Sequence, residues 1–482
     1  MSGTVRETEF EGRRVTVAGL GVSGAGAARA LLARGAEVTL VDGNDGERQR
    51  AQAGELTAAG VEVRLGDGDT LPKGAELVVT SPGWPPDHPL FAAAAEAGVP
   101  VWGDVELAWR LRGRDAAPWL AVTGTNGKTT TTRMLAAILA AAGLRTAAVG
   151  NIGVPVVDAV LADPPYDVLA VELSSYQLHW APSLRAHSGA VLNLAPDHLD
   201  WHGSMAAYAA DKGRIYAGNE VACVYNVADP ATEELVREAD VVEGCRAVGF
   251  TLGPPAPSQL GVVEGLLVDR AFVDRPDLAE ELAQVSDVDP PAPHNVANAL
   301  AAAALARAYG VPADAVRRGL AAYRPDPHRI SHVATVAGVG YVDDSKATNT
   351  HAALASLGAY PSIVWIAGGL AKGATFDELA AASADRLRGV VLIGADRRLI
   401  AEALTRHAPD VPVVDLDRTD TGAMAAAVSE ATRLAAPGDT VLLAPACASM
   451  DMFTNYNVRG DAFAAAVRQL AADPADQEPN EQ

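Results

Sequence analysis

The stretch Ala121–Thr132, AVTGTNGKTTTT, decides how the rest of this 482-residue sequence is interpreted. It predicts an apolar strand, a glycine-rich turn, and a helix that opens with a lysine and hydroxyl side chains. Backbone N–H groups at such a turn and at a helix N-terminus point toward one anion, which the helix dipole also favours. Lys128 can reach terminal phosphates, and the Thr129 hydroxyl is suited to holding Mg²⁺. The stretch therefore predicts a nucleotide-binding domain.

The predicted phosphate-binding loop is a shortened variant of the usual P-loop. That motif has a further glycine six residues before the lysine, where this sequence has Val122. An ordinary turn with a solvated lysine is the alternative, but the order strand, turn, helix favours phosphate binding. The predicted nucleotide-binding residues are Gly124, Thr125, Asn126, Gly127, Lys128, Thr129 and Thr130.

Length and composition limit the class of protein. A chain of 482 residues is too long for one ordinary core, so two or three domains are expected. The formal net charge of −22 argues against nucleic acid as a partner. Three scattered cysteines, a charged N-terminus and the lack of a membrane-length apolar run predict a cytoplasmic protein without disulfides or membrane insertion. We expect it to be a monomer.

The first segment carries a second glycine turn. Gly19-x-Gly21-x-x-Gly24, followed by Asp42 at the end of a strand, matches the dinucleotide-binding fingerprint. A nicotinamide-dependent dehydrogenase would explain this segment, but it leaves the phosphate-binding loop without a role.

Two breaks in the pattern predict linkers, near residues 112–118 and 323–327. The expected domains are residues 1–113, 114–325 and 326–482, the last with a disordered acidic tail from about Ala472.

The remaining strands and helices indicate an α/β fold throughout. In the middle segment, a strand over 167–171 runs into Glu172, and a helix capped by Ser204 carries Tyr208 and Lys212 on one face. In the last segment, strands over 363–367, 390–393 and 440–443 are separated by helices. The predicted fold has a Rossmann-like N-terminal domain, a central P-loop-type ATPase domain with a mainly parallel sheet, and a doubly wound Rossmann-like C-terminal domain.

Several separated motifs resemble those of the Mur ligase family, in the same order along nearly the whole chain. They are GTNGKTT, VELSSYQL, NLAPDHLDWHG, Lys212, His294-Asn295, Arg329, DDSKATN and PACAS. The resemblance implies an ATP-dependent ligase of peptidoglycan precursor synthesis that forms an amide bond through an acyl phosphate. DDSKATN and PACAS favour the D-glutamate-adding branch, with UDP-N-acetylmuramoyl-L-alanine as the other substrate. Sibling Mur ligases and folylpolyglutamate synthases share the ATP machinery and remain the alternative.

The resemblance also assigns roles to individual residues. It implies two Mg²⁺ ions, held by Thr129, Glu172, His198 and a carbamylated, CO₂-derived form of Lys212. Catalytic roles fall to Lys128, His198 and Lys212. Without the resemblance, Glu172 would be interpreted as a strand-end carboxylate, His198 as a loop histidine and Lys212 as a helix-surface lysine.

Substrate contacts follow from the same resemblance. ATP would also meet Asn295, Arg329 and Asp344, although a helix cap, a linker ion pair and a strand-end carboxylate are plausible readings of these. This sequence departs from the family after Asp42, because it has Gly43-Asn44 where side chains that reach the uracil are expected. The predicted contacts to the UDP substrate are Val22, Ser23, Asp42, Gly83, Asn151 and His198. The predicted contacts to D-glutamate are Lys346, Thr348, Ser449 and Phe453, of which Phe453 could equally belong to the core.

Overall fold

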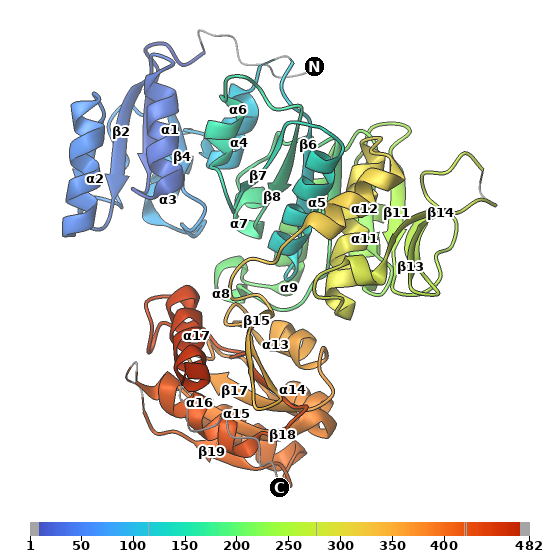
Figure 1. Cartoon of the computed structure of the whole chain (residues 1–482). Coiled ribbons are helices and arrows are strands. Elements are labelled where there is room, and N and C mark those ends of the chain that lie inside the picture. The colour runs from blue at the N-terminus through green and yellow to red at the C-terminus, as the bar shows by residue number, and fades with distance from the viewer. Residues whose placement is uncertain (1–8, 114, 276, 419, 421, 473–482) are drawn as a thin grey trace, which may run out of the picture. The chain divides into compact units, whose positions relative to one another are not determined.

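The computed structural model describes residues 9–113, 115–275, 277–418, 420 and 422–472. Its elements fall into two compact units (Figure 1). The first unit runs to residue 323 without 292–294, and the second comprises 292–294 and the chain from 324 onward. The acidic tail predicted from about Ala472 lies almost entirely outside the described residues.

The N-terminal part of the first unit is a five-stranded parallel sheet in the order β3-β2-β1-β4-β5. The Gly19-x-Gly21-x-x-Gly24 turn predicts a sheet of this kind. Its strands are β1 (Arg14–Ala18), β2 (Glu37–Asp42), β3 (Glu62–Leu65), β4 (Leu77–Thr80) and β5 (Val101–Gly103). Its helices are α1 (Val22–Leu32), α2 (Glu47–Ala58), α3 (Pro89–Glu96) and α4 (Asp104–Leu111).

The second sheet of this unit has nine strands in the order β14-β13-β12-β11-β10-β9-β6-β8-β7. Its strands are β6 (Trp119–Thr123), β7 (Thr146–Gly150), β8 (Val168–Glu172), β9 (Ser188–Val191), β10 (Ala222–Asn226), β11 (Arg246–Phe250), β12 (Gln259–Val263), β13 (Leu266–Asp269) and β14 (Glu280–Gln284). The pairs β12–β13 and β13–β14 are antiparallel and the other pairs are parallel, so the sheet is mainly parallel as predicted.

Helices surround this second sheet. They are α5 (Lys128–Ala141), α6 (Val156–Val160), α7 (Ser175–His179), α8 (Leu199–His202), α9 (Met205–Gly213), α10 (Pro230–Arg237), α11 (Pro293–Ala308) and α12 (Ala313–Ala322), with 3-10 turns at Arg214–Tyr216 and Val285–Asp287. Every residue of β6 is buried, as a parallel strand covered on both faces requires. One core cluster joins residues of α5, α11 and α12 to the sheet, and Figure 1 shows these three helices side by side.

The second unit holds a six-stranded sheet in the order β15-β16-β20-β17-β18-β19. Its strands are β15 (Ser331–Val336), β16 (Val339–Asp343), β17 (Ile363–Gly368), β18 (Leu387–Ile393), β19 (Val413–Asp415) and β20 (Thr440–Leu443). Its helices are α13 (Thr350–Leu357), α14 (Asp377–Ser383), α15 (Arg397–His407), α16 (Ala423–Leu434) and α17 (Tyr456–Ala472), with a 3-10 turn at Ala384–Arg386. All pairs except β15–β16 are parallel.

Alternating strand residues show that this sheet is covered on both faces. Trp365 belongs to a core cluster with residues of α13, α14 and α15, whereas its neighbour Ile366 belongs to one with residues of α16 and α17. Successive side chains of a strand point to opposite faces. The predicted doubly wound architecture is therefore confirmed.

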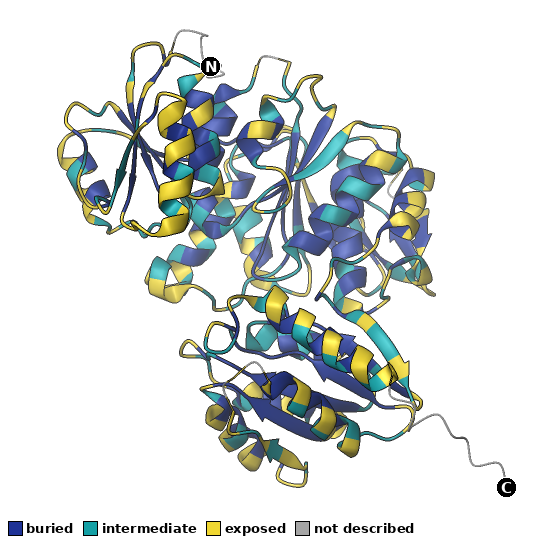
Figure 2. Ribbon diagram, turned by 60° about the vertical axis from the view of Figure 1, so that its left-hand side comes forward, coloured by how far each residue is buried: buried dark blue, intermediate teal, exposed yellow. Residues whose placement is uncertain are grey.

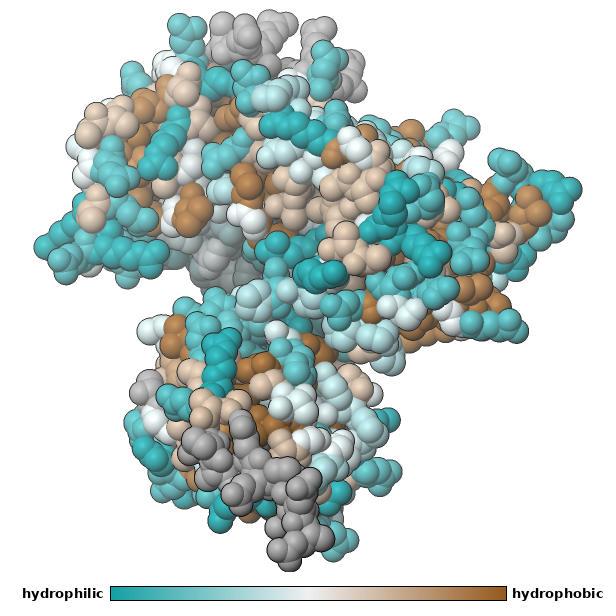
Figure 3. Space-filling view, in the orientation of Figure 1, coloured by the Kyte–Doolittle hydropathy of each residue, from teal (hydrophilic) through white to brown (hydrophobic). Residues whose placement is uncertain are grey.

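Burial follows the same layering over the described chain. Figure 2 shows the strands largely buried and the helices exposing one side. On the face drawn in Figure 3, hydrophilic side chains are spread among apolar ones. Among the described residues, no helix is both long and apolar enough to cross a membrane.

Candidate active site

The ends of four parallel strands bring the central candidate residues together. β6 lies between β8 and β9, with Val122 opposite Glu172 and Thr123 opposite Val191. β7 follows β8, with Gly150 opposite Glu172. Ligands of open α/β sheets bind beyond the carboxyl ends of the strands, so these positions share one edge of the sheet.

The glycine turn after β6 has the backbone conformation that its sequence predicts. Gly124 and Gly127 have φ angles of 147° and 83°, which side chains on L-residues rarely allow. Asn193, after β9, clamps the turn by accepting from the Asn126 N–H at 2.8 Å and donating to the Asn126 carbonyl at 3.1 Å. α5 starts at Lys128, and its N-cap Gly127 supplies no side-chain cap. The first N–H groups of a helix have no acceptor within the helix, which is the property that an anion site uses.

Thr129 and Glu172 meet directly at the start of α5. The Thr129 hydroxyl donates to Glu172 Oε2 at 2.7 Å, and the Asn151 amide donates to Oε1 at 3.0 Å. Gly150 permits this approach, because a Cβ on it would lie 2.3 Å from the Glu172 carbonyl oxygen. Three residues predicted on separate motifs therefore form one hydrogen-bonded group.

Lys128 and Lys212 converge on the same backbone oxygen. Their Nζ atoms donate to the Gly124 carbonyl at 2.9 and 2.8 Å. Lys212 is only 2% exposed, so the reading of it as a helix-surface lysine is wrong. Burial, reinforced by the charge of Lys128, holds the pKa of Lys212 well below its usual range, although Asp197, Glu172 and Asp211 oppose this.

Tyr208 fastens α9 to the phosphate-binding loop. Its hydroxyl lies 2.9 Å from Thr125 Oγ1, which also donates to the Ala195 carbonyl and accepts from the Ala195 N–H. Ser204 caps α9 by accepting from the Ala207 N–H at 3.2 Å, as predicted. Lys212 Nζ lies 4.6 Å from the centre of the Tyr208 ring.

His198 is the most exposed of the central candidates. It is the N-cap of α8, with a φ of 54° that a histidine seldom adopts. Its ring centre lies 5.0 Å from that of Tyr176, and its Nε2 lies 3.5 Å from Asp197 Oδ2. The backbone thus holds this imidazole in a defined but accessible position.

Asn295 reaches the loop through its neighbour on α11. The Asn298 amide donates to Asn295 Oδ1 at 3.3 Å. A Cβ on Gly127 would lie only 2.3 Å from Asn298 Oδ1. The start of α11 therefore packs against the glycine turn.

The strand order of the first sheet reverses between β1 and β4, and ligands of open α/β sheets bind at such a switch point. The Gly19 turn follows β1, and the loop with Gly83 follows β4. Val22 and Ser23 open α1, with Val22 69% exposed. Asp42 differs from the simple fingerprint, because its carboxylate accepts from the Leu20 N–H at 2.6 Å and the Asn44 N–H at 2.8 Å. It shapes two adjoining loops.

Within the second unit, Asp344 lies just after β16. Burial raises the pKa of Asp344 to about 6, against the charge of nearby Arg329 and a hydrogen bond from Ser356. Lys346 Nζ lies 4.2 Å from the Tyr456 ring centre, and the Thr348 N–H donates to the Lys346 carbonyl at 2.8 Å.

The neighbouring loop after β20 carries Ser449 and leads into Phe453. Both are buried, and Phe453 belongs to a hydrophobic core cluster. The side chain of Phe453 therefore belongs to the core, as the sequence allowed, and its contact with D-glutamate stays a prediction. Cys447 is a buried free thiol, whose pKa burial raises to about 12.

Arg459 was missed by the sequence analysis. It is 1% exposed and donates to Ser345 Oγ, the Ser345 carbonyl and the Cys447 carbonyl at 3.0, 2.8 and 3.1 Å. One guanidinium thus joins the loops that carry Lys346 and Ser449. An arginine near the start of a predicted helix does not by itself indicate that its side chain joins two loops.

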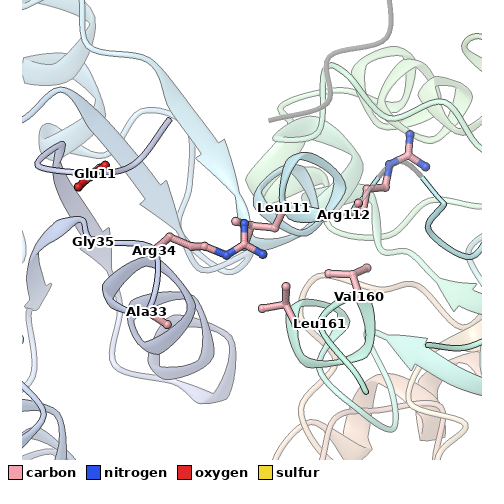
Figure 4. A pocket seen from close by; sticks show the side chains of 9 residues that line it. Glu11, Ala33, Arg34, Gly35, Leu111, Arg112, Val160 and Leu161 are labelled. Atoms are coloured by element: carbon pink, nitrogen blue, oxygen red, sulfur yellow. The ribbon is translucent and has the colours of Figure 1, made fainter. Parts of the chain in front are cut away.

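No group of three or more His, Cys, Asp or Glu within the described ranges could hold a metal ion by itself. A cavity of about 590 Å³ lies apart from the candidate residues, lined in part by Arg34, Leu111, Arg112 and Leu161. Figure 4 shows that its two arginine side chains point in different directions. It offers no convergent anion site.

Sequence models of one family match three stretches of the chain. The Mur ligase MurD-like N-terminal domain matches residues 13–103, the Mur ligase middle domain 122–306, and the Mur ligase glutamate ligase domain 328–447. The predicted domain limits themselves remain predictions.

Curated relatives match over nearly full length. The UDP-N-acetylmuramoylalanine--D-glutamate ligases of Streptomyces avermitilis and Streptomyces coelicolor are each 78% identical, over 96% of this chain and all of theirs. The enzyme of that name from Thermobifida fusca is 62% identical over the same shares.

Solved structures share the fold at low identity. A pseudomurein peptide ligase type C from Methanothermus fervidus has a TM-score of 0.58 at 17% identity, covering 95% of this chain and all of its own. The UDP-N-acetylmuramate-alanine ligase MurC of Thermotoga maritima has a TM-score of 0.57 at 18% identity, covering 95% and 99%.

Proposed function

The chain belongs to the Mur ligase family, and we propose that it joins D-glutamate to UDP-N-acetylmuramoyl-L-alanine in peptidoglycan precursor synthesis, converting ATP to ADP and phosphate. The observation that carries this is the 78% identity, over nearly all of both chains, to enzymes named for that ligation. The meeting of Thr129, Glu172, Lys128 and Lys212 at one sheet edge supports it.

The family uses ATP and Mg²⁺, and the residues present fit both. The Thr129 hydroxyl and Glu172 carboxylate are adjacent hard oxygen donors, which Mg²⁺ prefers. A small number of protein ligands is expected, since phosphates and water usually complete a magnesium site. The start of α5 offers N–H groups to phosphate. When bound, Mg²⁺ would neutralise charge on the phosphates.

In the proposed reaction, the terminal carboxylate of the UDP substrate takes the γ-phosphoryl group and becomes an acyl phosphate. The amine of D-glutamate then attacks the acyl carbon and loses a proton, and phosphate leaves as the amide forms. Phosphoryl transfer depends mainly on positioning and charge stabilisation. Lys128 would pair with the transferred phosphoryl group, and His198 would stand beside the reacting carboxylate.

We further propose that Lys212 is carbamylated and helps to hold a second Mg²⁺. Reaction with CO₂ requires a neutral amine. Burial and the shared Gly124 carbonyl favour that form, since two ammonium groups there would repel each other. The carbamate would convert a buried amine into an oxygen ligand.

The other predicted contacts stay part of the proposal. ATP would also meet Asn295, Arg329 and Asp344, and D-glutamate would meet Lys346, Thr348, Ser449 and Phe453. The UDP moiety would lie at Val22, Ser23, Asp42 and Gly83, with Asn151 and His198 nearer the reacting end of that substrate. The corresponding domains are residues 1–113, 114–325 and 326–482.

Phosphate release tests the function directly. With ATP, Mg²⁺ and UDP-N-acetylmuramoyl-L-alanine, D-glutamate should stimulate release, whereas L-glutamate, L-alanine, L-lysine and meso-diaminopimelate should not. A response to another amino acid, or none to D-glutamate, would defeat the assignment.

A further inference from the structure

A buried carboxylate lies next to Lys212 in the chain. Asp211 is 5% exposed and sits in the last turn of α9. A carboxylate is costly to bury unless several donors satisfy it. The groups that hydrogen-bond to Asp211 therefore indicate the role of this carboxylate.

Three side chains converge on this carboxylate. His179 Nδ1 lies 2.9 and 3.1 Å from its two oxygens, His202 Nδ1 lies 3.0 Å from Oδ2, and Arg214 Nε lies 3.1 Å from Oδ1. An ionised carboxylate only accepts hydrogen bonds, so each histidine must carry its proton on Nδ1. The Nε2 of a neutral His202 can then accept from the Ser175 hydroxyl, 2.9 Å away.

The partners of Asp211 belong to the elements that carry the proposed magnesium and phosphate ligands. His179 and Ser175 lie on α7, which follows the strand ending in Glu172. His202 ends α8, which begins directly after His198.

Asp211 itself precedes Lys212. Successive helix residues point about 100° apart, so Asp211 can hold the neighbouring helices while Lys212 reaches the phosphate-binding loop. One carboxylate thus contacts side chains from two neighbouring helices, which also meet through the His202–Ser175 hydrogen bond and the stacking of Tyr176 on His202.

The order serine, histidine, aspartate also occurs in nucleophilic hydrolases. Here the Ser175 residue is 2% exposed and the His202 side chain is fully buried, so a substrate cannot reach the hydroxyl. This geometry excludes covalent catalysis and leaves an orienting role.

We propose that Asp211 is a positioning residue, which through His179 and His202 holds Glu172, His198 and Lys212 in the arrangement that binds magnesium and nucleotide. This rests on the proposed function. Residues that orient metal ligands commonly change metal affinity or activity ten- to hundredfold when mutated.

Asp211→Asn tests the proposal because it keeps the size of the side chain and removes its charge. Binding of ADP is measured by calorimetry across a Mg²⁺ titration, beside kcat, the KM of each substrate and Tm. The expected result is a ten- to hundredfold higher Mg²⁺ requirement for ADP binding and a similar fall in kcat. The KM for the UDP substrate should change less than the Mg²⁺ requirement, because most of its predicted contacts lie on the loops of the first sheet.

Asp269→Asn is the matched control. Asp269, on β13, is a fully buried carboxylate of the same unit, and it accepts a hydrogen bond from Arg307 Nε at 2.9 Å. Its loss should lower Tm without changing the Mg²⁺ requirement. If Asp211→Asn behaves like this control, its role is merely structural and the proposal is overturned.

A second pair of variants covers the case in which Asp211→Asn does not fold. His202→Asn can still donate a hydrogen bond toward Asp211, whereas His202→Ala cannot. The Asn variant should bind ADP within threefold of wild type and the Ala variant at least tenfold more weakly at limiting Mg²⁺; equal affinities would refute positioning. Because this is a binding measurement, it stands even if D-glutamate fails to stimulate phosphate release, an outcome that would overturn only the proposed function.

Discussion

Gly127→Ala probes how tightly α11 supports the phosphate-binding loop. Gly127 has a φ of 83°, and an added Cβ would lie 2.3 Å from Asn298 Oδ1. The left-handed conformation costs an alanine about 1–2 kcal/mol, partly offset by about 0.4–1 kcal/mol from its stiffer unfolded chain. Displacing a buried neighbour adds about 1–3 kcal/mol. The expected loss of stability is about 2–4 kcal/mol.

Gly143→Ala provides the matched control for backbone strain. Gly143 has a φ of 84° just after the same helix, but nothing lies within 4 Å of an added Cβ. Its expected loss is only about 1 kcal/mol, which corresponds to roughly 2–4 °C in Tm for a domain of this size. The difference between the two variants therefore isolates the contact with Asn298.

Differential scanning calorimetry and calorimetric titration with Mg·ADP provide the two readouts. Gly127→Ala should weaken ADP binding at least tenfold, or by about 1.4 kcal/mol, while Gly143→Ala leaves it unchanged. Adding Asn298→Ala to Gly127→Ala should recover about 1–3 kcal/mol as coupling energy. Equal Tm losses in both glycine variants, with no such coupling, would refute the reasoning.

Four further changes test other parts of the site. Lys128→Ala should abolish ATP turnover while binding of the UDP substrate, measured by calorimetry, stays within twofold; loss of both would contradict separate sites. Removal of dissolved CO₂ should lower activity reversibly, and ¹³C NMR should show a carbamate signal that Lys212→Ala lacks; active enzyme with an unmodified lysine would count against carbamylation. Burial raises the pKa of Asp344 to about 6, so the folded state holds the proton of this carboxyl group more tightly than the unfolded state does. As pH rises from about 4 to 7, the wild type should therefore lose up to ~3 kcal/mol of stability relative to Asp344→Asn. Parallel pH profiles of stability for the two proteins would refute this. Arg459→Lys keeps the charge but loses the forked contacts to Ser345 and Cys447. The KM for D-glutamate should rise about tenfold from the loss of one or two hydrogen bonds. An unchanged KM would show that the loops hold their positions without the guanidinium group.

Local motifs predicted well both the fold class and the strand–turn–helix geometry of the candidate nucleotide-binding loop. The strand, the glycine turn and the first residues of α5 lie within about a dozen positions, so propensity and hydrogen-bonding geometry act along one short segment. Glu172 was found in the same way, because an apolar run ending in a carboxylate predicts a strand end. The family resemblance supplied the roles of residues whose local patterns were uninformative.

Residues whose meaning depends on distant partners were predicted less well. Lys212 reads locally as a surface lysine, yet its amine is buried against Gly124, 88 positions earlier. Arg459 and Asp211 gave no signal at all, since their partners come from other loops and helices. The predicted contact of Asp42 with the UDP substrate stays a prediction, and its hydrogen bonds to the backbone of two adjoining loops were not foreseen.

The amino-acid order alone determined that three sheets covered by helices form and that one glycine turn has the backbone conformation of a phosphate-binding loop. Those properties depend on the periodicity of apolar residues and on backbone freedom over a few neighbouring positions. Only the tertiary structure decided which lysine is buried, which carboxylate meets Thr129, and which charged groups hold the loops in place. The pKa of a side chain and the cost of its burial depend on the groups packed around it, and chain folding, not sequence proximity, selects those groups.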